Sequence, residues 1–539
     1  MSLHQLHIIH PSVHRATPRH AMESWRTLLA AAVLLGPLLL VLRRSGNNNP
    51  RGRRLPPGPP AVPLFGNLLW LRHSSVDVEP LLKRLFNKYG PVVTLRVGTR
   101  LNVFVADRRL AHAALVGAGT ALADRPRPVA NSLLGVSANI ITSTSYGPMW
   151  RLLRRNLVSE TLHPSRVLQF APARAWVRRV LMEKLREAGA APCDVVEAFQ
   201  YTMFCLLVLM CFGERLDEPA VRAIADAERA WLLHISAKLG VFFFLPSITR
   251  HLFRGRLQAA RALRRRQMEL LVPLIDARRE YKRQGTAAER RPETTLQHSY
   301  VDTLLDIALP EEGHRRLSDD EIVTLCSEFL NGGTDTTSTG LQWIMAELVK
   351  NPTVQEKLYS DIRYTCGDGE VSEDDIHNMP YLKAVVLEGL RKHPPGHFLL
   401  PHNAAEDTDV GGYLIPKGAT VNFMVAEMGR DGNQWTEPME FLPERFLEGG
   451  DGVGVDMTGT REIRMMPFGA GRRICPGLAI ATLHLEYFVA NMVREFKWEE
   501  VPGLKVEFAE KQEFTTVMKK PLRPRLVPRN VLSAEQRHA

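Results

Sequence analysis

The chain has 539 residues, 45% of them apolar, so it can bury a large core and is not disordered in bulk. The formal net charge is +11, but eight arginines and one glutamate in the first 54 residues supply most of it; no basic patch interleaved with aromatics accompanies it, which argues against nucleic-acid binding. The six cysteines are sparse and lack C-x-x-C spacing, so we expect at least five of them to be ordinary thiols.

The first 60 residues have the composition of a membrane anchor followed by a hinge. Leu28–Leu42 carry no charge, and the arginines after them favour a cytosolic location for the rest of the chain. The run is shorter than the about 20 residues of a spanning helix. A cleaved signal peptide is the alternative, although no small-residue cleavage site follows. We therefore expect an anchor over 22–44 and a stiff, basic, proline-rich hinge over 45–60.

Residues 1–21 contain five histidines and no acidic residue. Such a segment can bind metal or act as a transit peptide for import into an organelle. We expect instead an extension without regular structure, with Met22 as the functional start. At the other end of the chain, we expect a flexible tail over 529–539.

Several elements are predicted between the hinge and residue 300. The pattern indicates a helix over Leu81–Tyr89 and two paired strands, Val92–Val97 and Asn102–Ala106. A helix opens at Trp150 after Gly147-Pro148, and Arg154 shares its face with Trp150. The apolar run Val241–Pro246 is either packed in the core or forms a lid that enters the bilayer.

A long helix is predicted to begin with a capping box formed by Ser318 and Glu321. No stop signal occurs before Asn351-Pro352, so the helix has about thirty residues. Within it, Asn331–Thr337 holds two glycines and three threonines, which are poor helix formers. A break in local propensity at this place indicates either a functional site or close helix packing.

The last third of the chain continues with alternating elements. Glu388 and Arg391 are three residues apart on a predicted helix, and the sequence Pro443-Glu444-Arg445-Phe446 follows. The remaining predictions are a strand–turn–strand over Tyr413–Asn422, a buried helix over Leu478–Val493, and a closing hairpin of Phe514–Val517 with Leu522–Val527.

The most informative segment is PFGAGRRICPG, over residues 467–477. Cys475 stands at or just before a helix N-terminus, where the dipole and free N–H groups lower the pKa of a thiol. The glycines leave space for a flat ligand against the backbone, and Arg473 can reach an anion at its edge. A small buried hydrophobic cysteine is the alternative.

The spacing F-x-x-G-x-R-x-C-x-G in this segment resembles the haem-binding loop of the cytochrome P-450 superfamily. Together with the hinge and the sequence FLNGGTDTTSTG, the chain resembles a plant A-type microsomal member. The resemblance implies a mainly α fold with a smaller β-rich region, a triangular prism of helices around a buried haem. It also implies one catalytic domain over 61–528, with the Cys475 thiolate as the axial ligand of haem b.

The resemblance implies roles for further residues. Contacts with the haem or its propionates are expected from Trp150, Arg154, His402, Phe468, Arg473 and Gly477. His402 departs from the more frequent arginine, so its charge would depend on pH. Gly332 and Gly333 would leave room for dioxygen, and Asp335 would relay protons to Thr336 because splitting dioxygen consumes two protons. Buried ion pairs among Glu388, Arg391 and Arg445 would support the cysteine loop.

The reaction implied by the resemblance is insertion of one oxygen atom from dioxygen into a small apolar substrate. Electrons would come from NADPH through the NADPH-cytochrome P-450 reductase, at the endoplasmic reticulum membrane with the catalytic domain in the cytosol. Two alternatives remain: a haem-thiolate isomerase or peroxide-using enzyme that needs no reductase, and a non-catalytic haem-binding membrane protein. Retention of Thr336 favours monooxygenation over both.

Overall fold

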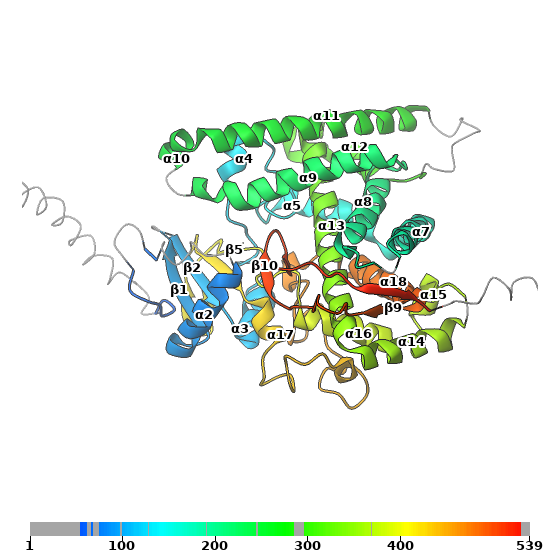
Figure 1. The fold of residues 1–539 in the computed structure, drawn as a ribbon. Helices are drawn as coiled ribbons and strands as arrows, with labels where there is room; N and C mark the ends of the chain where they lie inside the picture. The colour runs from blue at the N-terminus through cyan, green and yellow to red at the C-terminus, as the bar shows by residue number, and fades with distance from the viewer. Residues whose placement is uncertain are drawn as a thin grey trace, which may run out of the picture.

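The computed structural model describes residues 54–61, 66–67, 75–97, 100–127, 129–189, 191–243, 246–284, 296–367 and 369–529. The expected N-terminal extension, the anchor, most of the hinge and nearly all of the tail lie outside these ranges. Helices make up most of the described chain, and a smaller β-rich region lies to one side of them (Figure 1). The predicted fold class is therefore confirmed.

The helices and short helical turns follow one another along the whole described chain. In order, they are α2 (Ser75–Tyr89), α3 (Arg108–His112), η2 (Ala113–Gly117), α4 (Val129–Leu134), α5 (Pro148–Leu157), η3 (Val158–Leu162), α6 (Pro164–Gln169), α7 (Ala171–Glu187), α8 (Val195–Phe212), α9 (Glu218–Lys238), η4 (Gly240–Phe243), α10 (Pro246–Leu252), α11 (Arg254–Gln284), α12 (Tyr300–Asp306), η6 (Pro310–Glu312), α13 (Asp319–Lys350), α14 (Pro352–Cys366), α15 (Glu373–Ile376), α16 (Pro380–Lys392), α17 (Val425–Gly429), η7 (Pro443–Phe446), η8 (Gly471–Arg473) and α18 (Leu478–Glu495).

Helix α13 runs through the middle of the molecule (Figure 1). It begins after Ser318, whose hydroxyl accepts from the Glu321 N–H while the Glu321 carboxylate accepts from the Ser318 N–H, so the predicted capping box is confirmed. The helix ends at Lys350, before Asn351-Pro352, as expected. Most of its residues are buried, and α8 packs directly against it. Anything placed on α13 is therefore at the centre of the fold.

Helix α8 is almost entirely apolar and lies in the largest hydrophobic cluster. Of the helices that the structure describes, it alone has the length and hydropathy to cross a membrane, but 72% of its apolar window is buried inside the protein. This burial is typical of a core helix and gives α13 a rigid neighbour. The predicted anchor is a different segment and lies before the described residues.

The strands form one small sheet and four two-stranded ribbons. They are β1 (Val92–Val97), β2 (Arg100–Val105), β3 (Ala308–Leu309), β4 (Arg315–Arg316), β5 (His402–Asn403), β6 (Thr408–Val410), β7 (Tyr413–Ile415), β8 (Thr420–Phe423), β9 (Phe496–Glu499), β10 (Glu510–Gln512), β11 (Thr516–Met518) and β12 (Arg525–Pro528). The sheet has the order β1-β2-β8-β5, and β2 and β8 are its parallel pair.

One predicted strand pairing is wrong. The strand–turn–strand of Tyr413–Asn422 is confirmed, and in it β7 pairs with β6 while β8 joins the four-stranded sheet. The expected closing hairpin does not form: β11 pairs with β10, and β12 pairs with β9, which follows α18. Local sequence patterns predicted where the strands lie, but strand pairing depends on contacts between distant parts of the chain. The β1–β2 pair is confirmed, in register from Val92–Val105 to Val97–Arg100.

The apolar run after α9 has two environments. Phe242 is fully buried in a small cluster with Trp231, Leu239 and Leu257, which supports the core-packing interpretation for this residue. Phe243 beside it is 36% exposed. Phe244 and Leu245 lie outside the described residues, so the lid interpretation remains untested there.

Candidate active site

The segment with Cys475 is a tight loop between the β-rich region and α18. The Cys475 N–H donates to the Phe468 carbonyl over 2.8 Å, which closes the loop on itself. Gly471 has φ +70°, and a Cβ at this position would lie 2.1 Å from the Leu115 carbonyl oxygen of η2. Gly471 therefore permits close packing against another backbone, rather than leaving space for a flat ligand as expected. The loop is thereby held at a fixed place.

The surroundings of Cys475 only partly match the expectation. The helix after it begins at Leu478 with Gly477 as N-cap, so Pro476 precedes the helix rather than occupying its first turn. Burial raises the pKa of the Cys475 thiol, and this effect outweighs the Gly477 N–H and the nearby Arg154 charge, which both lower it. The expected lowering of the pKa is therefore wrong for the protein alone. A coordinated metal ion deprotonates such a thiol directly.

Three arginines gather beside the cysteine loop, and each is held by backbone carbonyls. Arg473 donates to the carbonyls of Ala123 (2.7 Å), Ile141 (3.1 Å) and Thr144 (2.6 Å). Arg125 donates to the carbonyls of Thr142, Leu400 and Pro401, and Arg154 donates to that of Ile474. None of the three forms an ion pair with a carboxylate in the part of the chain that the structure describes.

The absence of ion pairs has an electrostatic cost. Burial lowers the pKa of Arg473 to about 10 and, together with repulsion from Arg473, lowers that of Arg125 to about 9. Burial also lowers the pKa of Arg154. Asp124 and Glu328 act against this lowering without forming ion pairs with the three arginines. Clustered guanidiniums that form no ion pair can serve as donors to an anionic ligand. The two propionate groups of haem fit this requirement, so the residues present suit that cofactor.

His402 lies in the same region, but it does not supply the expected cation. Its ring is buried, and Nδ1 lies 2.7 Å from the Leu122 carbonyl oxygen, so Nδ1 carries the proton and Nε2 is left as an acceptor. Burial, with repulsion from Arg125 and Arg473, lowers the pKa of His402 to about 3. The structure therefore does not support His402 as a cationic partner for a propionate. Arg125, which the sequence analysis missed, is the charged residue there.

Trp150 packs among these cations. Its indole N–H donates to the Ile141 carbonyl over 3.0 Å, and the Arg473 and Arg154 guanidiniums lie 4.5 and 5.9 Å from its ring centroid. Helix α5 begins at Pro148, two residues before the predicted start at Trp150, with Gly147 as N-cap, and it places Trp150 and Arg154 on one face. The Trp150 ring therefore packs against both guanidiniums, and its N–H is already bonded to a backbone carbonyl.

The stretch 331–337 of α13 presents two different faces. Gly332 is exposed, and no atom lies within 4 Å of the Cβ it lacks. Thr336, one turn later, donates its hydroxyl proton to the Gly332 carbonyl over 2.8 Å. Gly332 is therefore a place of exposed helix surface on a helix that is otherwise mostly buried. At Gly333, by contrast, a Cβ would lie 2.8 Å from Leu207 of α8, so this glycine serves helix packing and its expected role beside dioxygen is not supported.

Asp335 is buried on the side of α13 that faces α8 and α9. It accepts from Arg229 over 3.0 Å and from Gln200 over 3.3 Å. Burial raises the pKa of Asp335, although the Arg229 charge acts against this. Arg229 also donates to Glu513 over 2.8 Å, in the turn between β10 and β11. A partly exposed arginine therefore links the buried acid to the protein surface.

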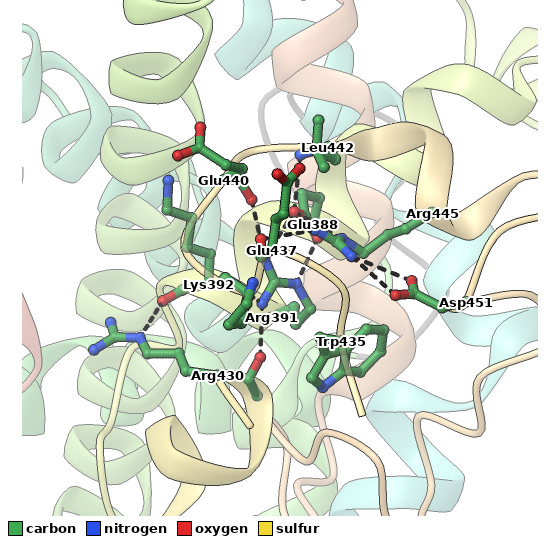
Figure 2. Close-up of polar contacts among 12 residues, drawn as sticks. Glu388, Arg391, Lys392, Arg430, Trp435, Glu437, Glu440, Leu442, Arg445 and Asp451 are labelled. Carbon is green, nitrogen blue, oxygen red and sulfur yellow. Dashed lines mark hydrogen bonds and ion pairs between the residues drawn. The ribbon is translucent and has the colours of Figure 1, made fainter. Parts of the chain in front are cut away.

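Glu388, Arg391 and Arg445 form the predicted ion pairs (Figure 2). Arg391 donates to both oxygens of Glu388, at 2.6 and 2.8 Å, and Arg445 donates to one of them at 3.1 Å. The Leu442 N–H adds a fourth bond to this carboxylate, at 2.9 Å. Glu388 is fully buried.

The remaining donors of the two arginines hold the segment after α17. They bond carbonyls of residues 429–440, and Arg445 also pairs with Asp451 (Figure 2). Trp435 lies against both guanidiniums and that of Arg464, which precedes the cysteine loop by three residues. The ion pairs therefore hold the segment over residues 429–440, and their support of the cysteine loop stays a prediction.

Together, the cysteine loop, the three arginines without ion pairs and the exposed Gly332 of α13 suit a haem-thiolate site in a helical fold. The comparisons with known proteins agree. The family model for cytochrome P450 matches residues 56–527, and the chain belongs to this family. The protein is accordingly a cytochrome P450 monooxygenase with haem-thiolate chemistry, which confirms the sequence-based identification of family, fold and enzyme class.

Similar proteins include plant enzymes, and similar solved structures include an animal one. The chain is 44% identical to cytochrome P450 89A9 of Arabidopsis thaliana over 494 residues, 88% of this chain and 94% of that protein. It is 31% identical to the flavonoid 3'-monooxygenase of the same plant, over 93% of this chain and 97% of that protein. A zebra fish cytochrome P450 with progesterone matches at a TM-score of 0.68 and 23% identity, over 84% of this chain and 99% of that one, which supports the fold alone.

Proposed function

We propose that the protein inserts one oxygen atom from dioxygen into a small apolar substrate, with electrons from NADPH delivered by the NADPH-cytochrome P450 reductase. The observation that carries the proposal is the unpaired state of Arg125, Arg154 and Arg473 beside Cys475. These residues would hold haem b through its propionates and its iron. When bound, that cofactor supplies dioxygen activation, and its thiolate ligand favours O–O cleavage.

The residues of α13 would supply protons and space. Gly332 leaves the helix surface open, and the Thr336 hydroxyl, beside it, is placed to hold water. Asp335 precedes Thr336 and is linked through Arg229 to Glu513. A carboxyl group connected to the surface can be reprotonated after each turnover. Asp335 and Thr336 are therefore the proposed catalytic residues, with Arg229 in a supporting position.

The proposed partner surface lies on α5 and the cysteine loop. Arg151, Arg155 and Arg472 are exposed there, and Arg472 donates to the Tyr146 hydroxyl over 2.8 Å. A cluster of exposed arginines attracts an acidic partner and accelerates its association. The reductase would dock on this face. The proposed location is the endoplasmic reticulum membrane, with residues 22–44 as anchor and the catalytic domain in the cytosol.

The experiment that tests the proposal combines membranes, reductase and labelled dioxygen. A panel of small apolar compounds is incubated with the full chain, reductase and NADPH, and products are analysed for one labelled oxygen atom. We expect labelled products that require both NADPH and reductase. Turnover with peroxide alone, and none with reductase, would favour the isomerase or peroxide-using alternative.

Removing residues 1–54 should release the protein from membranes; full retention would contradict the proposed anchor.

A further inference from the structure

Helix α9 contacts the opened stretch of α13 through two consecutive residues. Glu228 bonds Asn331, and Arg229 bonds Asp335, one helical turn further along α13. Helices α9 and α11 lie across one end of α13 (Figure 1). The two contacts flank Gly332, where the helix surface is open. The side chains that α9 fixes are therefore those next to the exposed surface at Gly332, where the proposed function expects dioxygen and substrate.

Glu228 is the centre of a buried polar network. It is 1% exposed, and it accepts from the Ser327 hydroxyl (2.5 Å), the Asn331 amide (2.7 Å) and the Gln267 amide (2.9 Å). Ser327 Oγ in turn lies within hydrogen-bond distance of the Gln267 and Asn331 amide nitrogens, at 3.0 and 3.2 Å. All the neighbours of the Glu228 carboxylate are donors, so the network is satisfied.

This network determines which way the Asn331 amide points. Ser327 has one hydroxyl proton, and it gives this proton to Glu228. Only an NH2 group of Asn331 can then satisfy both Ser327 Oγ and the Glu228 carboxylate. With the amide turned round, its carbonyl oxygen would face two acceptors. The nitrogen therefore points toward α9, and the carbonyl oxygen Oδ1 points away from it.

The Oδ1 atom of Asn331 is free to accept a hydrogen bond. No residue in the described part of the chain donates to it, and it is not among the fully buried polar atoms. Asn331 is half-buried and directly precedes exposed Gly332. We propose that Asn331 is a specificity-determining residue, held by Glu228 and Ser327 so that Oδ1 accepts a hydrogen bond from an O–H or N–H group of the substrate.

This inference rests on the proposed function and adds to it that the apolar substrate carries one donor group. A fixed acceptor in a mostly apolar space distinguishes ligands that differ only in that group. The free energy of one such hydrogen bond corresponds to a roughly 3- to 10-fold higher affinity for the ligand that carries the donor. A second consequence concerns Glu228, which is a positioning residue because it acts on the ligand only through Asn331.

The test uses two probes that differ in one donor, 2-naphthol and its methyl ether 2-methoxynaphthalene. The spectral shift of the haem-loaded full chain is titrated with each, and the ratio of the two dissociation constants is the readout. We expect the wild type to bind the naphthol roughly 3- to 10-fold tighter. Asn331→Leu, of similar volume, should reduce the ratio to about 1. Thr334→Val is the matched control, since the Thr334 hydroxyl bonds only the Leu330 carbonyl of its own helix.

The role of Glu228 is tested in the same assay. Glu228→Ala should reduce the ratio of the two dissociation constants toward 1, because the Asn331 amide can then rotate. Glu228→Gln retains an acceptor oxygen for the amide, so its ratio should stay near that of the wild type. Three results would overturn the inference. The wild type could bind both probes with equal affinity, Asn331→Leu could leave the ratio of the two dissociation constants unchanged, or the haem-loaded protein could bind neither probe. Such results leave the proposed monooxygenase function standing, because the carbon monoxide spectrum and reductase-dependent turnover report on that function separately.

Discussion

Replacing Glu388 by Gln tests whether the buried ion pairs maintain the fold around the cysteine loop. The change keeps the shape of the side chain but removes a charge that accepts four hydrogen bonds, three of them from guanidiniums. An amide nitrogen would then face the Arg391 donors, so the Arg391 guanidinium would lose its carboxylate and that of Arg445 would keep only Asp451. Removing one partner of a buried pair costs about 3–5 kcal/mol. We therefore expect Glu388→Gln to lower the free energy of unfolding by about this amount.

Urea unfolding followed by tryptophan fluorescence and by haem retention measures this loss. Glu444→Gln is the matched control, because Glu444 is adjacent to Arg445 but pairs with Lys357 at the surface, at 2.8 Å. An exposed pair of this kind contributes less than about 1 kcal/mol. If Glu388→Gln and Glu444→Gln unfolded at similar urea concentrations, the buried pairs would not have the structural role assigned to them.

Three further predictions follow from single positions. Thr336→Ala should release peroxide at the expense of product, since the hydroxyl proposed to hold water is lost; the peroxide formed per NADPH consumed measures this. Gly471→Ala should reduce haem incorporation, because its Cβ would meet the Leu115 carbonyl at 2.1 Å, whereas at Gly477 the nearest atoms are 3.7 Å away and alanine should be tolerated. Burial alone would lower the pKa of His397, but the Glu510 and Glu79 carboxylates beside its ring raise this pKa above its usual value. The stability from protonated His397 is present below pH 6.5 and is lost as the pH rises through the raised pKa, so His397→Gln should flatten this decline in urea unfolding.

Each of these expectations has an outcome that would contradict it. Peroxide release equal to that of the wild type would remove Thr336 from the proton relay. Haem incorporation by Gly471→Ala at the wild-type level would mean that the loop does not need its close contact with η2. A decline of stability above neutral pH that is the same with and without His397 would assign that decline to another group.

The sequence predicted the site best where a few neighbouring residues determine both the local backbone conformation and the side chains of the site. The cysteine loop, the capping box of Ser318 and Glu321, and the pair Glu388–Arg391 are local patterns, and the structure bears out their placement. Propensity alone indicated that residues 331–337 are unusual. It could not separate Gly332, which faces open space, from Gly333, which packs on α8, because that difference depends on a second helix.

The features that the sequence did not predict come from contacts between distant residues. Arg125 stands in a proline-punctuated loop without periodicity, and only the fold brings it near Arg473, 348 positions later in the numbering of the chain. The expected pH-dependent charge of His402 is not supported, because burial and the neighbouring Arg125 and Arg473 lower its pKa to about 3. The orientation of Asn331 depends in the same way on Glu228, which no local pattern singled out.

The carbon monoxide difference spectrum of the dithionite-reduced full chain tests the central claim most directly. A haem held by the Cys475 thiolate gives the strongly red-shifted band of this class of protein, and Cys475→Ala should abolish that band. The account predicts both results. A band at the position of histidine-ligated haem in the wild type, or an unchanged red-shifted band in Cys475→Ala, would contradict the assignment of Cys475 as the iron ligand.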